Sequence, residues 1–233
     1  KTFLIRLKSD GSMDENFEPF ITDGIAFNFY MATENENIII NGSTQMGNKY
    51  GLSKLDQTGK IVVNFKPETS RYGVITMGDY YNGKLLIAGD FIKINEIESF
   101  GLAKLFQDGT VDPLFSLSEN HGKIIHIKVL AEDTLLVCTG SELFKLGPNA
   151  EFYTNFDFHF FKTLHQISKI KVLDNKKIMV GDANNIYRLN SNGSEDISFD
   201  IGLGIGGTKS TSFDFDIQND NIIYGSAFNS YNS

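Results

Sequence analysis

The chain repeats one short pattern five times, and this repetition restricts its possible folds more than any other feature. Each copy runs through Lys or Arg, Leu and a short polar turn to a final Phe. The copies are Phe3–Phe17, Gly51–Phe65, Gly101–Phe115, Glu142–Phe156 and Asn185–Phe199. Successive final phenylalanines are 48, 50, 41 and 43 residues apart. A period of roughly 40 to 50 residues is typical of repeat architectures.

A second segment precedes each copy and supplies two more strands. It alternates apolar and polar residues, turns at Asn, Asp or Gly, and ends in a β-rich run; the segments are Phe27–Ser43, Gly73–Phe91, Ile124–Gly140, Ile167–Ala183 and Thr211–Phe228. Alternation with period two predicts strands, and Asp10-Gly11, Asp108-Gly109 and Asn192-Gly193 predict tight hairpins. Each unit should therefore form four antiparallel strands, A to D, which make one blade of a β-propeller.

The two ends of the sequence carry complementary parts of such a unit. The sequence starts with a strand C segment, Phe3–Lys8, and finishes after a strand B segment, Asn221–Phe228. Counted through the two ends, Leu189 and Leu7 are 51 residues apart, which matches the internal spacings. We expect an all-β fold in which residues 1–233 form a single β-propeller domain, with five four-stranded blades closed by pairing the N- and C-terminal strands. The alternative is a set of consecutive blades from a larger propeller.

The repeated motif resembles that of the bacterial delta-60 repeat family of β-propellers. The copies that carry the resemblance are Arg6–Phe17, Gly83–Phe91, Ala103–Phe115 and Arg188–Phe199. Two copies depart from the pattern, because Val62 replaces the Asp after the turn and Ala150 replaces the turn Gly. The resemblance implies a secreted or cell-surface bacterial protein, with this chain as part of a larger polypeptide or assembly. It implies no shared catalytic residues.

Composition excludes several classes of function. The net charge of −8 and the isoelectric point near 5.0 argue against a nucleic-acid partner, which requires a basic surface. No apolar run approaches the roughly 20 residues that span a membrane, so we expect no membrane insertion. Gly202, Gly204 and Gly207 match a dinucleotide-binding fingerprint but lack the surrounding strand and helix that it requires. The four histidines show no ligand spacing, so we expect no cofactor and no metal.

The recurring residues have structural explanations. The final Phe and the motif Leu of each copy should fill the space between neighbouring blades. Asp14, Asp112 and Asp196 follow the turn by three residues, where a carboxylate either accepts backbone N–H bonds or ligates a cation. Pro113 falls in the expected strand D, and because Pro is confined to sheet edges, D should be outermost and A nearest the axis.

Binding residues are expected where the repeats differ. The B–C and D–A loops vary in length and composition; they are Thr44–Lys49, Lys66–Tyr72, Ile92–Ser99, Ser116–Lys123, Asp157–Gln166 and Ile201–Lys209. Loops held by a rigid scaffold concentrate binding residues. The candidate binding residues on this variable-loop face are Arg71, Tyr72, Asn120, His121, Phe160, Phe161, His165 and Lys209.

One pair of acidic residues supports a second hypothesis. Asp214 and Asp216 alternate along a strand A, which places their Cα atoms about 6.5–7 Å apart and within the range of glycosidase carboxyl pairs. Lys169 and Lys171 hold the corresponding positions in the preceding unit, which favours structural neutralisation of the charges. We therefore expect a non-enzymatic binding, adhesion or scaffold domain with a protein or glycan partner, located outside the cell. A carbohydrate-active enzyme or glycan-binding propeller, with acidic residues at the channel mouth, is the alternative.

Overall fold

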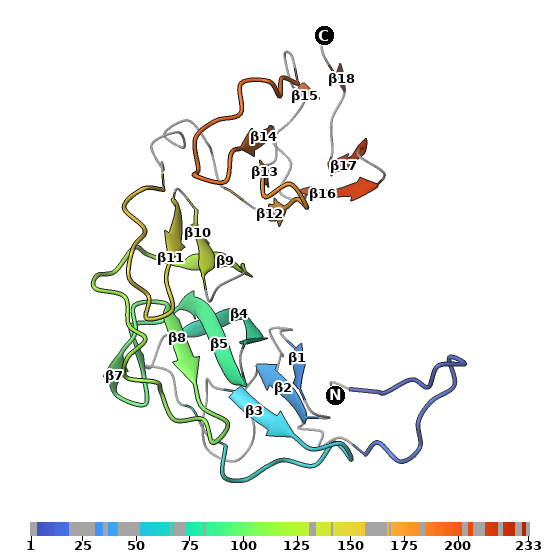
Figure 1. Ribbon diagram of the computed structural model, residues 1–233. Coiled ribbons are helices and arrows are strands. Elements are labelled where there is room, and N and C mark those ends of the chain that lie inside the picture. The colour runs from blue at the N-terminus through green and yellow to red at the C-terminus, as the bar shows by residue number, and fades with distance from the viewer. Residues whose placement is uncertain are drawn as a thin grey trace. The chain divides into compact units, whose positions relative to one another are not determined.

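The computed structural model describes residues in two compact units, Lys1–Ile124 and Ile125–Ser233, which are treated separately (Figure 1). The described residues are 4–18, 31–34, 37–41, 52–65, 67, 73–81, 83–130, 134–140, 142–156, 167, 169–181, 185–201, 205–206, 213–218, 221–226 and 230–231. Over these ranges the secondary structure consists of strands, with no helix. The described part of the chain accordingly contains no helix that could cross a membrane.

Antiparallel three-stranded sheets form the first unit. The first sheet has the order β1 (Met31–Glu34), β2 (Asn37–Asn41), β3 (Leu52–Leu55), and the second has the order β4 (Val74–Tyr81), β5 (Lys84–Asp90), β8 (Leu102–Leu105). These strands are the expected A, B and C of two consecutive repeats. In both sheets the motif Leu of strand C lies opposite the first apolar residue of strand B, as Leu105 does opposite Leu85.

The second unit repeats this arrangement. One sheet contains β9 (Ile124–Val129), which begins at the last residue of the first unit, with β10 (Leu135–Thr139) and β11 (Leu143–Leu146). The next contains β12 (Lys169–Val172), β13 (Ile178–Gly181) and β14 (Ile186–Leu189). Two-stranded pairings follow: β16 (Phe213–Gln218) with β17 (Asn221–Ser226), and β15 (Ile205–Gly206) with β18 (Ser230–Tyr231). The predicted all-β, antiparallel architecture is therefore confirmed.

The expected strand D is shorter than predicted. In each copy it is an isolated bridge from the motif Leu to the residue six positions later, as between Leu105 and Val111. Pro113 lies in the turn after that bridge and is exposed, so its position does not identify an outer strand. Within the described residues the blades therefore have three strands and a bridge.

The C–D turn has the same backbone shape in every copy. One residue takes a positive φ, at 84° in Gly11, 86° in Gly59, 87° in Gly109 and 87° in Gly193. Ala150 holds this position in the degenerate fourth copy at a φ of 65°, a left-handed conformation that favours Gly. The turn thus persists even where its preferred residue is missing.

The Ile92–Ser99 loop, expected on the variable face, forms a small hairpin of its own. Its strands are β6 (Lys93–Ile94) and β7 (Ile97–Glu98), joined through two residues at positive φ. The Asn95 side-chain amide at the hairpin tip donates a hydrogen bond of 3.1 Å to the Gly109 carbonyl in the C–D turn of the same repeat. The hairpin is therefore fixed against its own blade.

Most motif leucines and final phenylalanines lie in the core as predicted, but Phe156 and Phe199 are only partly buried and Leu7 is exposed. Leu55, Leu105, Leu146 and Leu189 are at most 1% exposed, and Phe17, Phe65 and Phe115 at most 7%. Leu7, the same residue of the first copy, is 57% exposed. Its described pairing is the bridge to Met13, while β17 pairs with β16, so pairing of the terminal strands stays a prediction.

Candidate functional site

Two of the eight predicted loop residues lie in the described part of the chain. The Asn120 side-chain oxygen accepts a hydrogen bond of 2.8 Å from the Gly122 backbone N–H, so it fixes its own turn. His121 Nε2 lies 3.7 Å from Glu119 Oε1, with the His side chain 17% exposed. Arg71, Tyr72, Phe160, Phe161, His165 and Lys209 lie outside the described residues. The binding role of this set stays a prediction.

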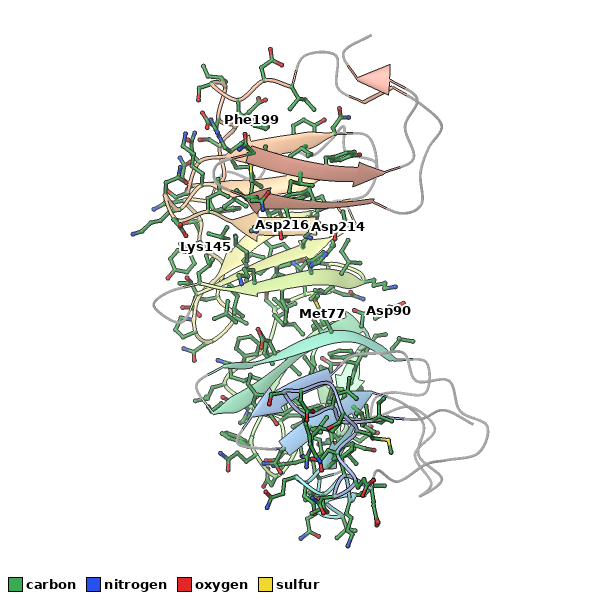
Figure 2. The ribbon with its side chains drawn as sticks, turned by 90° about the vertical axis from the view of Figure 1, so that its right-hand side faces the viewer. Met77, Asp90, Lys145, Phe199, Asp214 and Asp216 are labelled. Carbon is green, nitrogen blue, oxygen red and sulfur yellow. The ribbon has the colours of Figure 1, made fainter. Side chains whose placement is uncertain are left out.

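Asp214 and Asp216 pair with lysines of the neighbouring strand A. Both carboxylates lie on the exposed face of β16 (labelled in Figure 2), with the buried Phe215 between them on the other face. Lys169 donates a hydrogen bond to Asp214 and Lys171 to Asp216. These bonds, with backbone N–H donors and the lysine charges, hold the pKa of each carboxyl below its usual value. The arrangement matches the neutralisation that the sequence favoured.

A contact that the sequence reading missed explains why each copy carries Lys or Arg before Leu. The motif cation, meaning this Lys or Arg, lies over an aromatic ring of its own copy. The distances to the ring centroid are 4.8 Å for Arg6–Phe17, 5.8 Å for Lys54–Phe65, 4.3 Å for Lys104–Phe115, 4.8 Å for Arg188–Phe199 and 4.8 Å for Lys145–Tyr153. Such contacts are attractive through the ring quadrupole. The constant spacing of cation and Phe was the available signal.

The aspartates after the turn fix the hairpin, as one of the two predicted roles required. Asp14, Asp112 and Asp196 each accept a bond from the backbone N–H two residues later, at 3.1, 3.2 and 3.2 Å. In Asp112 and Asp196 the other oxygen binds a Lys at the start of strand B or immediately before it, and in Asp14 it binds Arg6. Lys84 Nζ lies 2.7 Å from Asp112, and Lys177 Nζ 2.6 Å from Asp196. Among the described residues no three His, Cys, Asp or Glu side chains come together, and the cation-ligating role stays a prediction.

These interactions shift the carboxyl pKa values in one direction. The hydrogen bonds from Lys177, from Ser198 and from Arg188 place the pKa of Asp196 far below its usual value. For Asp112, burial raises the pKa, but the bonds from Lys84 and from the Leu114 N–H more than offset it. A general acid needs a raised pKa near the working pH. The pKa values of these carboxyls are lowered instead, so the groups stay ionised and suit the ion pairs that stabilise the blade.

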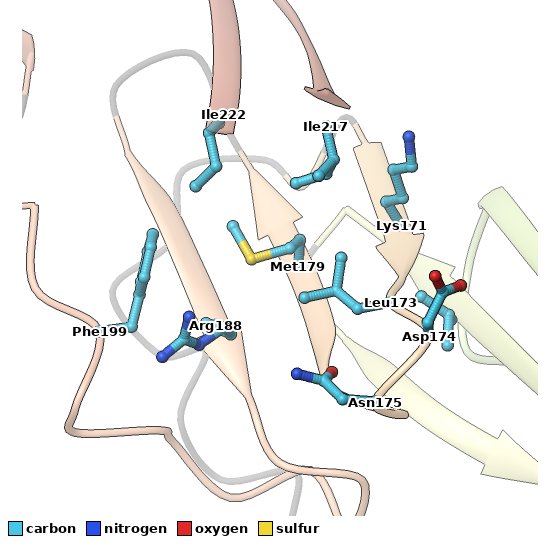
Figure 3. Close-up of a pocket in the computed structure, with 10 residues that line it drawn as sticks. Lys171, Leu173, Asp174, Asn175, Met179, Arg188, Phe199, Ile217 and Ile222 are labelled. Atoms are coloured by element: carbon cyan, nitrogen blue, oxygen red, sulfur yellow. The ribbon is translucent and has the colours of Figure 1, made fainter. Parts of the chain in front are cut away.

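The second unit also contains a groove between the β12–β13–β14 sheet and the β16–β17 hairpin. Its volume is about 770 Å³. Figure 3 shows Met179 in the middle, with Ile217 and Ile222 of the hairpin near it and Phe199 and Arg188 on the other side. Arg188 is paired with Asp196, and Lys171 with Asp216. Both cations that line the groove are therefore already paired with carboxylates of the same unit.

Family comparison supports the β-propeller architecture. The family described as "Domain of unknown function (DUF5122) beta-propeller" matches residues 82–115, which run from the start of β5 through the third copy of the motif. No curated protein matches the chain. The delta-60 repeat resemblance itself stays a prediction.

Solved structures with a similar fold share little sequence with this chain. The AfRom2 CNH domain is 9% identical, with a TM-score of 0.54 over 94% of this chain and 64% of that one. The extracellular domain of BT4673 from B. thetaiotaomicron, described as a putative one component system, is 13% identical, with a TM-score of 0.53 over 85% of this chain and 26% of that one. A protein of unknown function from Bacteroides caccae is 16% identical, with a TM-score of 0.49 over 91% and 74%. At these identities the likeness shows the fold alone, and this chain spans less than two thirds of the first two structures.

Proposed function

We propose that this chain is a non-enzymatic binding or scaffold domain of a secreted or cell-surface bacterial protein. The observation that carries the proposal is the pairing of the repeated aspartates with lysines and arginines of the protein itself. The aspartates after the turn and the strand A aspartates bind lysines or arginines of the protein itself, and their pKa values are lowered. The repeated charges thus serve blade assembly, which leaves ligand recognition to the loops that differ between repeats.

The proposed architecture is a single five-bladed ring, with a delta-60 type motif in each blade. Its support is the fivefold repetition of the motif, with final phenylalanines 48, 50, 41 and 43 residues apart. The extracellular location is supported by the sequence resemblance and by the extracellular origin of one protein of similar fold. A protein or glycan partner on the variable-loop face follows from the aromatic and cationic residues there, including Tyr72, Phe160 and Phe161.

The test is a thermal-shift screen of the 233-residue chain against a glycan panel and candidate extracellular proteins. A ligand at 100 times its Kd stabilises the folded state by about 2.7 kcal/mol, which is readily measured. The double variant Phe160→Ala/Phe161→Ala should abolish the shift. Ile197→Ala, which removes an 89% exposed apolar side chain in the fifth copy, should keep it. Equal ligand responses in both variants would contradict the placement of the site.

A carbohydrate-active enzyme is the second candidate, and the spacing of Asp214 and Asp216 favours it. The same glycan panel is assayed for released reducing sugar with wild type, Asp214→Asn and Asp216→Asn. Turnover by wild type that is lost in either variant would replace the binding proposal with catalysis. Binding without turnover in all three proteins supports the binding domain.

A further inference from the structure

In the first unit, the C–D turn of the second copy accepts hydrogen bonds from the first copy. Arg6 Nη1 donates a hydrogen bond of 2.6 Å to the Gln57 carbonyl, and the Glu18 N–H donates one of 2.9 Å to the Thr58 carbonyl. Arg6 is the motif cation of the first copy, and Glu18 follows its final Phe. The first copy thus binds the turn of the second at two points.

The contact of the motif cation recurs one copy later. Lys54, the motif cation of the second copy, donates a hydrogen bond of 3.4 Å to the Gln107 carbonyl. Gln57 and Gln107 each lie two residues before the turn Gly of their copies, so the two cations bind equivalent carbonyls. The second copy has Val62 in place of the Asp after the turn. The contact with the next turn is therefore kept where the ionic partner is missing.

The turn's own hydrogen bonds use other carbonyls. In the second copy the Gly59 N–H donates to the Asp56 carbonyl and the Asp56 N–H to the Lys60 carbonyl, both at 2.9 Å. The carbonyls of Gln57 and Thr58, which lie between them in the chain, accept their bonds from the first copy. The turn therefore offers carbonyl acceptors to a neighbouring element, and the preceding copy uses them.

The final Phe of the second copy also packs on the turn Gly of the third. A Cβ on Gly109 would lie 3.2 Å from Phe65 Cδ2 and 3.2 Å from Pro67 Cδ. Phe65 is 4% exposed and belongs to a buried cluster that contains Leu105 and Val111 of the third copy. Gly109 therefore has two roles, because its φ of 87° forms the turn and its lack of a side chain leaves room for the Phe ring.

The turn of the third copy also holds the β6–β7 hairpin. The Asn95 side chain of the hairpin donates to the Gly109 carbonyl. Ile94, beside it, is 0% exposed and belongs to the same buried cluster as Phe65. A connection that differs between repeats is thus attached to a turn that the second copy also contacts.

We propose that, in the first three copies, the C–D turn couples each blade to the preceding one, with the motif cation and the final Phe of one copy bound to the turn of the next. Displacement of a turn then removes contacts of the preceding blade, so consecutive blades open together. In the third repeat the coupling extends to the β6–β7 hairpin. This coupling is independent of any ligand and goes beyond the proposed function.

A double-mutant cycle tests the Phe65 contact. Gly109→Ala should lower Tm by about 4–10 °C, because the new Cβ adds a clash with the ring to the cost of a left-handed Ala. Phe65→Leu removes ring atoms beside this Cβ, so the double variant should lose at least about 2 °C less than the sum of the single losses. Gly11→Ala is the matched control, at a φ of 84° with no described atom within 4 Å of its Cβ, and should combine additively with Phe65→Leu. Additive losses for Gly109→Ala, or equal non-additivity in the two pairs, would overturn the proposal.

Hydrogen exchange tests the motif cation separately. Lys54→Met should raise the exchange rate of the Gly109 amide about two- to tenfold relative to the amides of β10, because the turn loses a hydrogen bond from the preceding copy. Lys54→Arg keeps a donor and should leave this rate unchanged. Lys60→Met is the control, at an exposed lysine of the second-copy turn, and should also leave it unchanged. No increase in Lys54→Met, or an equal increase in Lys60→Met, would overturn the proposal. Neither experiment involves a ligand, so the coupling can fail while the binding function holds, and the reverse.

Discussion

The ion pair between Lys84 and Asp112 should stabilise its blade by more than a surface ion pair does. Lys84 Nζ lies 2.7 Å from Asp112 Oδ2, with the Lys side chain 33% and the Asp side chain 8% exposed. Exposed pairs contribute about 0.2–1 kcal/mol, and hydrogen bonds to charged groups about 1.5–3 kcal/mol. One partner is buried and the other half-exposed, so we expect a coupling energy of about 1.5 kcal/mol, between these ranges.

A double-mutant cycle in urea measures this coupling. The variants are Lys84→Met, Asp112→Asn and their combination; Asn keeps an oxygen acceptor for the Leu114 N–H but loses the charge. Lys93 and Glu96 provide the control cycle, since their charged atoms are 4.0 Å apart and their side chains 41% and 94% exposed. That pair should couple by less than about 0.5 kcal/mol. A Lys84–Asp112 coupling no larger than the control would refute the reasoning.

The same coupling should disappear in acid. The pKa of Asp112 is lowered overall: burial raises it, but the bonds from Lys84 and the Leu114 N–H outweigh burial. A carboxyl with a lowered pKa in the folded state contributes its full stability above its unfolded pKa, about 3.9. That stability is lost as the pH falls through the folded-state value. Coupling that persists undiminished near pH 2 would contradict an ionic origin.

Three further substitutions or measurements test the packing. Gly89→Ala places a Cβ 2.0 Å from a carbonyl oxygen of the paired strand, and it should reduce the free energy of unfolding by about 3 kcal/mol in a urea titration. Gly225→Ala is the control, because the nearest atom to its Cβ is 3.9 Å away. It should change the free energy of unfolding by less than about 0.5 kcal/mol. Phe115→Ala should cost about 3–5 kcal/mol, against no measurable cost for Leu114→Ala. Cys138, which is 0% exposed and whose thiol pKa is raised by burial, should react with Ellman's reagent only after denaturation; rapid reaction of the native protein would contradict its burial.

The sequence was sufficient to predict the strands, the turns and the core because each depends on local chemistry. Period-two alternation marked strands A, B and C, and the turn Gly marked the residue at positive φ. Strand D was predicted too long, because residues such as Asp112 and Pro113 follow its first apolar position and turn the chain there. The hairpin at Ile92–Ser99 was missed for a related reason: its turn uses Asn95 and Glu96 at positive φ, where Gly would have marked it.

The charge clusters depend on contacts between strands, yet the sequence contained a usable signal for them. Lys84 is the first residue of β5 in the third repeat, and Lys177 immediately precedes β13 in the fifth. Both repeats carry Asp after the turn. In the second repeat strand B begins with Asn37, and the position after the turn holds Val62. The fourth repeat has Thr134 before β10 and again no Asp after its turn. In these four repeats the Lys and the Asp appear together and are absent together, which indicates a contact between them.

The motif cation can contact two partners in its copy, the Asp after the turn and an aromatic ring. The second contact explains how the degenerate fourth copy keeps its fold. In the first and fifth copies, as in Arg188 with Asp196, the cation binds the carboxylate and covers the final Phe. In the fourth copy Tyr153 replaces the Asp, and Lys145 lies over the Tyr ring instead. The cation keeps an attractive partner although the ionic one is gone, so selection on blade assembly can tolerate loss of the carboxylate. Because the repeated charges are held in packing contacts within their own repeats, we expect a ligand to bind at the loops that differ between repeats.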